Sequence, residues 1–385
     1  MKKFFALTMA LCMVLSLFAG CASGGTKADP NTIKIGTSGP LTGGAAVYGT
    51  AVEAGMKIAV AEINAAAEAN GGLKIEFKAA DDEHDNEKAL NAYNSLKDWG
   101  MQIFAGAVTT GPCLQIAPEA VADQIFMMTP SGSSEKIALS GSNVFQMCFT
   151  DPNQGASAAE LVHKLNLGTT IGIIYDNSDD YSKGLMQGFK EKAAEYGMNI
   201  VVETSFTADN KSDLSTQITQ CKDAGCDFVF LPFYATEAAQ VLTHANKIDY
   251  HPVFFGCDGL DGVLTVEGFD PALAEGVMLL TPFSADAADE ATQSFVAKFQ
   301  EKTGIIPNQF AADAYDVIYA IAQACEKGGV NASMSASEIN AILVEQFTSM
   351  TFDGLTGSGM TWKATGEVSK EPMAVVIENG VYVGA

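Results

Sequence analysis

Short apolar runs alternate with longer amphipathic segments in the first part of the chain. Four of these runs have the length and composition of buried β-strands, at residues 32–37, 73–77, 102–105 and 125–128. The segments between them are predicted helices, at residues 48–67, 86–99 and 113–123. In the first of these segments, Val52, Met56, Val60 and Ile63 recur at helical spacing. This order of strands and helices predicts an α/β fold with a parallel, doubly wound sheet.

A second set of the same kind follows along the chain. Its predicted strands lie at residues 170–175, 200–203, 228–231 and 252–256, and its predicted helices at residues 154–165, 182–196, 212–224 and 236–247. Beyond Thr281, three more helices are predicted, at residues 287–303, 309–326 and 336–347. The tail from Phe352 is β-like. The pattern therefore predicts two similar α/β units, although their sequences show no recognisable repetition.

The first twenty residues have the pattern of an export signal. Lys2 and Lys3 precede an apolar run at residues 4–20, which is short for a membrane-spanning helix. The run ends in Leu-Phe-Ala-Gly before Cys21, which resembles a bacterial lipobox, although Phe18 stands where leucine is usual. We therefore expect a signal peptide at residues 1–20 and lipidation of Cys21. An ordinary signal peptide with an incidental cysteine is the alternative.

The segment after the signal is small, polar and contains glycine, so residues 21–30 are expected to tether a folded part to the lipid. Such a tether spans at most about 30 Å. The predicted location is therefore extracytoplasmic, with the protein held at the membrane through its lipid anchor.

Composition narrows the range of partners. A chain of 385 residues suffices for two or three domains, and 48% hydrophobic residues can fill a large core. Acidic residues outnumber basic ones by 46 to 22, which gives a net charge of −24. A chain with this charge lacks the basic surface that nucleic acid requires, and it is not attracted to anionic lipid by charge.

Few residues are arranged for covalent or metal chemistry. Six cysteines would remain in the processed chain, at positions 113, 148, 221, 226, 257 and 325. They are scattered in apolar patterns, so we expect buried free thiols, although pairing is possible in an exported protein. Ser133 and Lys136 have the SxxK spacing of serine β-lactamases, but the partner motifs are missing. No cofactor, metal site or enzymatic activity is predicted.

Polar residues follow several predicted strands, where open α/β sheets bind their ligands. These residues are Tyr48, Thr110, Ser131, Ser133, Tyr181, Tyr234 and Asp258. The surrounding motifs, in order, are IKIG at 33–36, GPLTG at 39–43, YG at 48–49, DD at 81–82, MTPS at 128–131, DYSKG at 180–184 and FDGLTG at 352–357. This ordered set resembles the branched-chain amino-acid binding proteins of ABC transporters, and the resemblance runs from about residue 31 to the end.

The resemblance implies the type I periplasmic-binding-protein fold, with two doubly wound α/β lobes joined by a three-stranded hinge. Lobe one would comprise residues 31–150 and 281–353, and lobe two residues 151–280 and 354–385. Closure of the lobes would trap the ligand. The resemblance also implies a monomer that captures an amino acid and delivers it to the permease of an ABC importer.

A zwitterionic amino acid needs donors for its carboxylate and an acceptor for its ammonium group. By the resemblance, the donors would be the hydroxyls of Thr110 and Ser133 and the backbone N–H groups of Ser131, Gly132 and Ser133. Asp258 would accept from the ammonium group. The remaining contacts would come from Tyr181 and Tyr234 in lobe two and from Tyr48, Val108, Thr109 and Phe310 around the ligand's side chain. Each of these residues also has a simpler role open to it, as a core, turn or helix-cap residue.

The chain departs from its relatives at a few positions. Where some relatives have a disulfide between the loop after Asp82 and the binding loop, this chain has His84 and Thr109. Pro112 and Pro232 are also unusual. An aliphatic amino acid is favoured as the ligand, with a polar amino acid, an amide or an aromatic acid as alternatives. A sensory ligand-binding module is the second functional hypothesis, and an enzyme on the same scaffold is the third.

Overall fold

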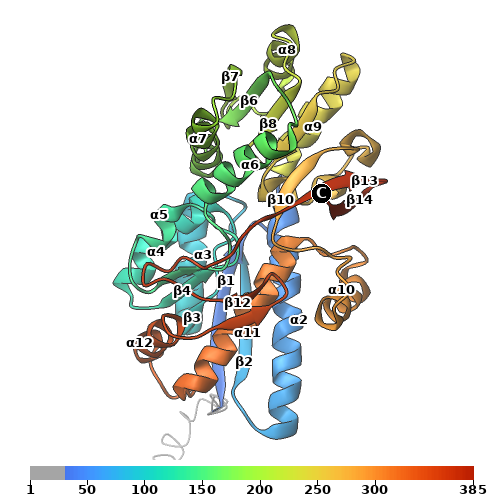
Figure 1. Cartoon of the computed structure of the whole chain (residues 1–385). Coiled ribbons are helices and arrows are strands. Elements are labelled where there is room, and N and C mark those ends of the chain that lie inside the picture. The colour runs from blue at the N-terminus through green and yellow to red at the C-terminus, as the bar shows by residue number, and fades with distance from the viewer. Residues whose placement is uncertain (1–30) are drawn as a thin grey trace, which may run out of the picture.

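The structure is a computed structural model that describes residues 31–385, and these residues form two α/β lobes (Figure 1). The predicted signal peptide, Cys21 and the tether at residues 21–30 lie outside the described residues. Within residues 31–385, no helix combines the length and apolarity needed to cross a membrane.

Lobe one is built on a parallel five-stranded sheet in the order β2-β1-β3-β4-β5. Its strands are β1 (Thr32–Gly39), β2 (Lys74–Asp81), β3 (Ile103–Phe104), β4 (Phe126–Thr129) and β5 (Val144–Gln146). Its helices are α2 (Ala46–Asn70), α3 (Asn86–Trp99), α4 (Thr110–Ala122), α5 (Glu135–Ala138), α10 (Glu290–Thr303), α11 (Gln309–Gly328) and α12 (Ala336–Phe347).

Alternate residues of these strands enter two different cores, because successive side chains of a strand point to opposite faces of the sheet. Ile103 and Phe126 pack in the core that contains α2, α11 and α12, whereas Phe104 and Met127 pack in the core that contains α3 and α4. The helices therefore cover both faces of the sheet, as the doubly wound prediction requires.

Lobe two is built on a seven-stranded sheet in the order β14-β13-β10-β9-β8-β6-β7. Its strands are β6 (Ile171–Asp176), β7 (Ile200–Phe206), β8 (Phe228–Leu231), β9 (Val253–Gly256), β10 (Met278–Thr281), β13 (Met373–Glu378) and β14 (Val381–Gly384). Strand β13 runs antiparallel to both of its neighbours, and the other pairings are parallel. The helices are α6 (Asp151–Leu165), α7 (Asp180–Glu195), α8 (Ser215–Asp223) and α9 (Ala235–Lys247), with short 3-10 turns η1 (Asp258–Leu260), η2 (Val263–Thr265) and η3 (Pro271–Ala274).

Helix caps fix the ends of the helices that carry candidate site residues. The Asp179 side chain accepts a hydrogen bond from the Tyr181 N–H at the start of α7, and the Asn308 side chain accepts one from the Ala311 N–H at the start of α11. Gly329 ends α11 in a left-handed conformation with φ of 67°. Tyr181 and Phe310 are thus both held in the first turn of a capped helix.

Within residues 31–385, the chain passes between the lobes three times. The first joins β5 to α6 at residues 147–150, and the second joins β10 to α10 after Thr281. The third was predicted at residues 353/354, and that boundary is wrong. The antiparallel pair β11 (Phe352–Gly354) and β12 (Gly357–Met360) is followed by a segment that still packs on lobe one.

Two contacts keep this segment with lobe one. The Trp362 ring packs edge-on against Phe347 of α12, at 4.9 Å between ring centroids, and its indole N–H donates to the Gln146 carbonyl at 2.9 Å. Lys370 is paired with Asp313 of α11 at 2.6 Å. The third crossover therefore lies between Lys370 and the start of β13.

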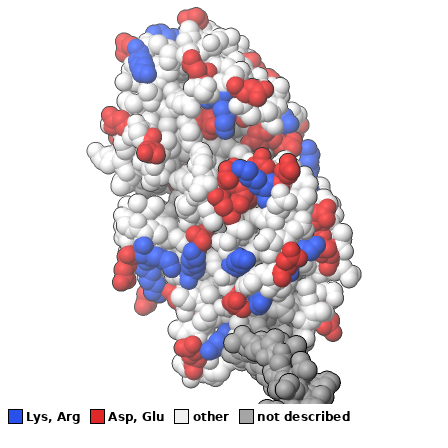
Figure 2. Space-filling view, turned by 180° about the vertical axis from the view of Figure 1, so that it is seen from behind, with Lys and Arg blue, Asp and Glu red and all other residues white. Residues whose placement is uncertain are grey.

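Acidic side chains are spread over both lobes on the face seen in Figure 2, with lysines interspersed among them. Most ion pairs lie at the surface, such as Lys190 with Glu203, but the pair of Lys370 and Asp313 is almost fully buried. Surface pairs contribute little to stability, so the buried pair is the one whose loss should be measurable.

Candidate ligand-binding site

A small cavity lies between the lobes at the carboxyl ends of their strands. The volume of this cavity is about 10 Å³. Its lining residues are Tyr48, Val108, Thr109, Thr110, Ser131, Ser133, Tyr181, Tyr234, Asp258, Gly259 and Phe310. The structure thus brings together every residue that the sequence suggested, except Gly132, and adds Gly259.

Lobe one presents hydrogen-bond donors to this cavity. Thr109 occupies the N-cap position of α4 and Thr110 begins the helix, so the free N–H groups of its first turn lie beside the cavity. Pro112 falls within that turn, where its missing N–H does no harm. The Ser133 hydroxyl is buried and makes no hydrogen bond within 3.5 Å, whereas the Ser131 hydroxyl donates to the Val108 carbonyl at 2.7 Å.

Gly132 shapes the loop instead of lining the cavity. Its N–H donates to the Thr129 hydroxyl at 2.8 Å, and its carbonyl accepts from the Gln146 amide at 2.7 Å. A Cβ atom at this position would lie 2.5 Å from the sulfur of Cys113. The loop can pack against α4 only because residue 132 has no side chain.

Lobe two presents a carboxylate. Asp258 is 3% exposed, and its Oδ1 accepts from the Tyr181 hydroxyl at 2.6 Å and from the Gly259 N–H at 2.9 Å. Burial raises the pKa of Asp258 to about 6, and the hydrogen bond from Tyr181 offsets only part of that rise. Among residues 31–385, no lysine lines the cavity, so the carboxylate lacks a counter-charge from this part of the chain.

Four aromatic rings form the rest of the wall. Tyr181 and Tyr234 are stacked at 4.9 Å, and the Tyr48 ring lies 5.3 Å from Tyr234 and 4.8 Å from Phe310. The largest influence on the hydroxyls of Tyr48, Tyr181 and Tyr234 is burial, which raises each pKa well above the usual value. These phenols therefore stay neutral and can donate hydrogen bonds.

The Tyr48 hydroxyl joins the two lobes. It belongs to α2 of lobe one, yet it donates to the Gly259 carbonyl at 2.6 Å and accepts from the Ala235 N–H at 2.7 Å, both in lobe two. A second link runs from the Thr236 hydroxyl to the Gly44 carbonyl at 2.8 Å. The lobes are therefore closed over the cavity in this structure.

His84 and Thr109 meet, as expected for positions that a disulfide joins in some relatives. His84 Nδ1 lies 2.9 Å from the Thr109 hydroxyl, and the imidazole packs edge-on against Tyr234 at 5.3 Å. Burial lowers the pKa of His84 to about 4, so the ring is neutral at physiological pH. A hydrogen bond thus links the two loops where those relatives have a covalent bond.

Three residues near Asp258 were not suggested by the sequence. The Gln154 side chain accepts from the Asp258 N–H at 3.1 Å, and the Gln309 side chain donates to the Asp258 carbonyl at 3.3 Å. At Gly259, a Cβ atom would lie 2.5 Å from the Tyr181 hydroxyl. Gly259 could have been suggested from the sequence, because it directly follows the candidate acid Asp258. Gln154 and Gln309 could not, because both belong to helices remote from Asp258 in the sequence.

The arrangement suits binding more than catalysis. Donors lie on one side, a carboxylate lies on the other, and aromatic rings enclose the space between them. The six cysteines of residues 31–385 are buried and unpaired, and no group of three or more His, Cys, Asp or Glu side chains in that range could hold a metal ion. Fold and site together define a two-lobed solute-binding protein.

Comparison with known proteins agrees with that class. The chain belongs to the periplasmic binding protein family, whose sequence pattern matches residues 32–380. Membership of a family of solute-binding transport proteins confirms two predictions, that the chain is not an enzyme and that it acts outside the cytoplasm.

Curated relatives and a solved structure are similar over most of their length. The leucine-, isoleucine-, valine-, threonine- and alanine-binding protein of Pseudomonas aeruginosa is 29% identical over 81% of this chain and 82% of its own. A Leu/Ile/Val-binding protein homolog of Brucella melitensis is 27% identical over 94% and 95% of the two chains. The branched-chain amino-acid transporter substrate-binding protein of Streptococcus pneumoniae, solved with isoleucine, is 25% identical, has a TM-score of 0.81, and is matched over 92% of this chain and 100% of its own.

Proposed function

We propose that this protein is a lipid-anchored solute-binding protein that captures an amino acid with an aliphatic side chain and delivers it to an ABC importer. The observation that carries the proposal is the pairing of helix-terminal and hydroxyl donors in lobe one with the cation-free carboxylate of Asp258 in lobe two. The two groups face the same cavity and suit the two charges of a zwitterion. The names of the relatives from Pseudomonas aeruginosa and Streptococcus pneumoniae support an amino acid as the ligand.

Binding would proceed by hinge closure. The carboxylate of the ligand would first contact Ser133 and the start of α4, since these belong to lobe one. Closure would then bring Asp258 and Tyr181 to the ammonium group, and the Tyr48 hydroxyl would fasten lobe one to lobe two. The mechanism needs no covalent step, because the ligand is only held and released.

Thermal denaturation in the presence of single compounds tests the ligand class. The purified protein is heated with each of the twenty amino acids, with small amides and with aromatic acids. A ligand at about 100 times its Kd stabilises the folded state by about 2.7 kcal/mol, which raises the midpoint visibly. We expect shifts with leucine, isoleucine or valine. Shifts with benzoate or amides alone would contradict the amino-acid assignment.

The anchor is tested separately. Cys21→Ser should leave the protein unlipidated, so that it is released from the membrane or retains an uncleaved signal. A processed Cys21→Ser chain that stays at the membrane would refute lipidation without affecting the ligand assignment. Ala22→Ser, a substitution of a neighbouring small residue in the tether, is the matched control.

A further inference from the structure

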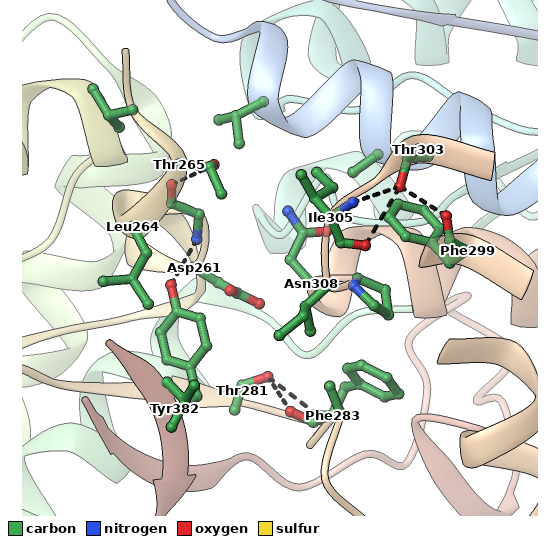
Figure 3. Close-up of a pocket in the computed structure, with 18 of the residues that line it drawn as sticks. Asp261, Leu264, Thr265, Thr281, Phe283, Phe299, Thr303, Ile305, Asn308 and Tyr382 are labelled. Atoms are coloured by element: carbon green, nitrogen blue, oxygen red, sulfur yellow. Dashed lines mark hydrogen bonds between the residues drawn. The ribbon is translucent and has the colours of Figure 1, made fainter. Parts of the chain in front are cut away.

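A second and much larger pocket, of about 1100 Å³, also lies between the lobes (Figure 3). Lobe one contributes the start of α2 and residues from α10 and the loop before α11. Lobe two contributes residues 261–267 and parts of β10, β13 and β14. The pocket is distinct from the small cavity, because the two share no lining residue.

The short turn η1 separates the two spaces. Asp258 begins η1 and lines the small cavity, whereas Asp261 directly follows η1 and lines the large pocket. Gln309 contacts both acids, since its backbone N–H donates to Asp261 Oδ2 at 2.8 Å and its side chain donates to the Asp258 carbonyl at 3.3 Å. The two spaces are therefore neighbours that are lined by different residues.

The lining of the large pocket is mainly apolar, and its charged residues are all acidic. Its apolar lining includes Leu264, Phe283 and Phe299, and the side chains of Ile305 and Val381 are about half exposed beside it. In the part of the chain that the structure describes, the charged residues that line it are Asp261, Glu267 and Asp286, without a lysine or histidine. An anion in this space would meet three carboxylates and no cation.

One of these acids is buried and incompletely bonded. Asp261 is 4% exposed, and its Oδ1 has no hydrogen-bond partner within 3.5 Å. Its carboxylate points into the space between Tyr382 and Asn308 (Figure 3). The Tyr382 hydroxyl accepts from the Gly262 N–H at 3.0 Å. Burial raises the pKa of Asp261 to about 7, although hydrogen bonding to Gln309 and to the Tyr382 hydroxyl opposes that rise.

We propose that this pocket binds a hydrophobic amine, with the ammonium group on Asp261 and the apolar body against Leu264, Phe283 and Phe299. A neutral apolar molecule would leave Asp261 Oδ1 without a partner, and an anion would be repelled. Only an apolar cation satisfies both the buried carboxylate and the apolar walls. Because the amine and the proposed amino acid occupy different spaces, both can bind at the same time.

Calorimetric titration with three probes of matched shape tests this assignment. The probes are phenethylamine, phenethyl alcohol and 3-phenylpropionate, which differ in the charge of the terminal group. We expect phenethylamine to bind at least about tenfold more tightly than the alcohol, and the carboxylate not to bind. Equal affinity for the amine and the alcohol would overturn the proposal, and this comparison needs no variant.

Variants locate the binding. Asp261→Asn should weaken phenethylamine at least tenfold, whereas Asp286→Asn, a matched change at another acid of the same pocket, should change the affinity less than threefold. Ala285→Phe should narrow the pocket beside its apolar wall and weaken amine binding while amino-acid binding persists. Unchanged amine affinity in Asp261→Asn, or competitive displacement of the amine by an amino acid, would refute this site. Failure of every amino acid to bind would instead refute the proposed function alone.

Discussion

Asp258 is the residue on which ligand selection depends in this account. Its carboxylate is buried, is bonded at Oδ1 by Tyr181 and Gly259, and faces a cavity without a lysine. A buried charge of this kind is unfavourable until a cation arrives. An ammonium group would supply that cation, so binding and neutralisation would coincide.

Asp258→Asn should weaken amino-acid binding by at least about 30-fold, because truncating one partner of a buried charge pair costs about 2–5 kcal/mol. The free energy of unfolding at neutral pH should not fall, since the raised pKa of Asp258 means that its charge is unfavourable in the folded state. Titration calorimetry and urea denaturation measure the two effects. The control is Asp223→Asn, at an exposed acid of α8. Loss of stability together with binding would count against a direct role.

Helix α2 acts as more than a structural support for lobe one, because it carries the Tyr48 hydroxyl into lobe two. The two hydrogen bonds of that hydroxyl exist only when the lobes are closed. In an open form, water would form the hydrogen bonds to the Gly259 carbonyl and the Ala235 N–H in place of Tyr48. The two hydrogen bonds of the Tyr48 hydroxyl should therefore favour closure without affecting the stability of either lobe.

Tyr48→Phe should weaken ligand binding about tenfold, since it leaves two buried polar groups unpaired in the closed form. The free energy of unfolding of the unliganded protein should change little if that protein is mainly open. The matched control is Tyr93→Phe, whose hydroxyl bonds Asp123 within lobe one at 3.1 Å. Equal affinities for Tyr48→Phe and the unaltered protein would show that the hydroxyl has no role in closure.

The third crossover is anchored by a buried ion pair. Lys370 donates to Asp313 and to the Thr356 hydroxyl, each at 2.6 Å, and the side chains of the pair are 1% and 2% exposed. The anchor fixes the end of the lobe-one segment directly before β13 enters lobe two.

Lys370→Met should lower the free energy of unfolding by about 3 kcal/mol, because it leaves Asp313 buried without its partner. The double variant Lys370→Met/Asp313→Leu should recover only part of the loss, because Lys370 also opposes the rise in the pKa of the buried Asp316, which remains. Urea denaturation of the single and double variants measures both effects. A double variant no more stable than Lys370→Met would mean that packing, and not charge, explains the loss.

The periodic pattern predicted the longer elements well. The predicted bounds of α3, β8 and α12 coincide with those observed, because their apolar residues contact one core at regular spacing. Strands β5 and β10 were not assigned, since such short runs carry little signal of their own, whereas the equally short β8 lies between two predicted helices. The lobe boundary at residues 353/354 came from the resemblance alone, because the long-range contacts of Lys370 leave no local signal in the sequence.

The site could be predicted residue by residue only through the resemblance to a family. Its lining residues come from loops and from the first turns of helices between positions 48 and 310, and spacing along the chain does not bring them together. The hydroxyls and Asp258 were identifiable because they follow strands. Gln154 and Gln309 were not, since the first reaches Asp258 through the packing of α6 within lobe two and the second through the approach of α11 from lobe one.

At the scale of the whole molecule, buried acids should govern the dependence of stability on pH. Burial raises the pKa values of Asp82, Asp258 and Asp313 to about 6 and those of Asp179 and Asp261 to about 7. Such groups hold protons more tightly when folded. Their contribution to stability is therefore fully present below the unfolded pKa of about 3.8 and is lost as the pH rises through 6–7.

Other acids act in the opposite sense. Hydrogen bonds and Lys298 hold the pKa of Glu62 below its usual value despite the opposing effect of burial, and hydrogen bonds do the same for Asp81 and Asp227. Their contribution is present above the unfolded pKa and is lost as the pH falls. The unliganded protein should thus be most stable between about pH 4 and 6, and its melting midpoint should drop by about 5 °C or more towards pH 8. Thermal melts across this range measure it, and a midpoint that rises steadily to pH 8 would contradict the account.

The most direct test of the central claim compares each branched-chain amino acid with the acid that lacks its amino group. Leucine is titrated against 4-methylpentanoate, and valine against 3-methylbutanoate, by calorimetry on the unaltered protein. The account predicts that the amino acids bind and that the acids bind at least about 30-fold more weakly, because Asp258 then stays buried without a counter-charge. Equal binding of an amino acid and its deaminated analogue would contradict the account, since Asp258 would then not recognise the ligand.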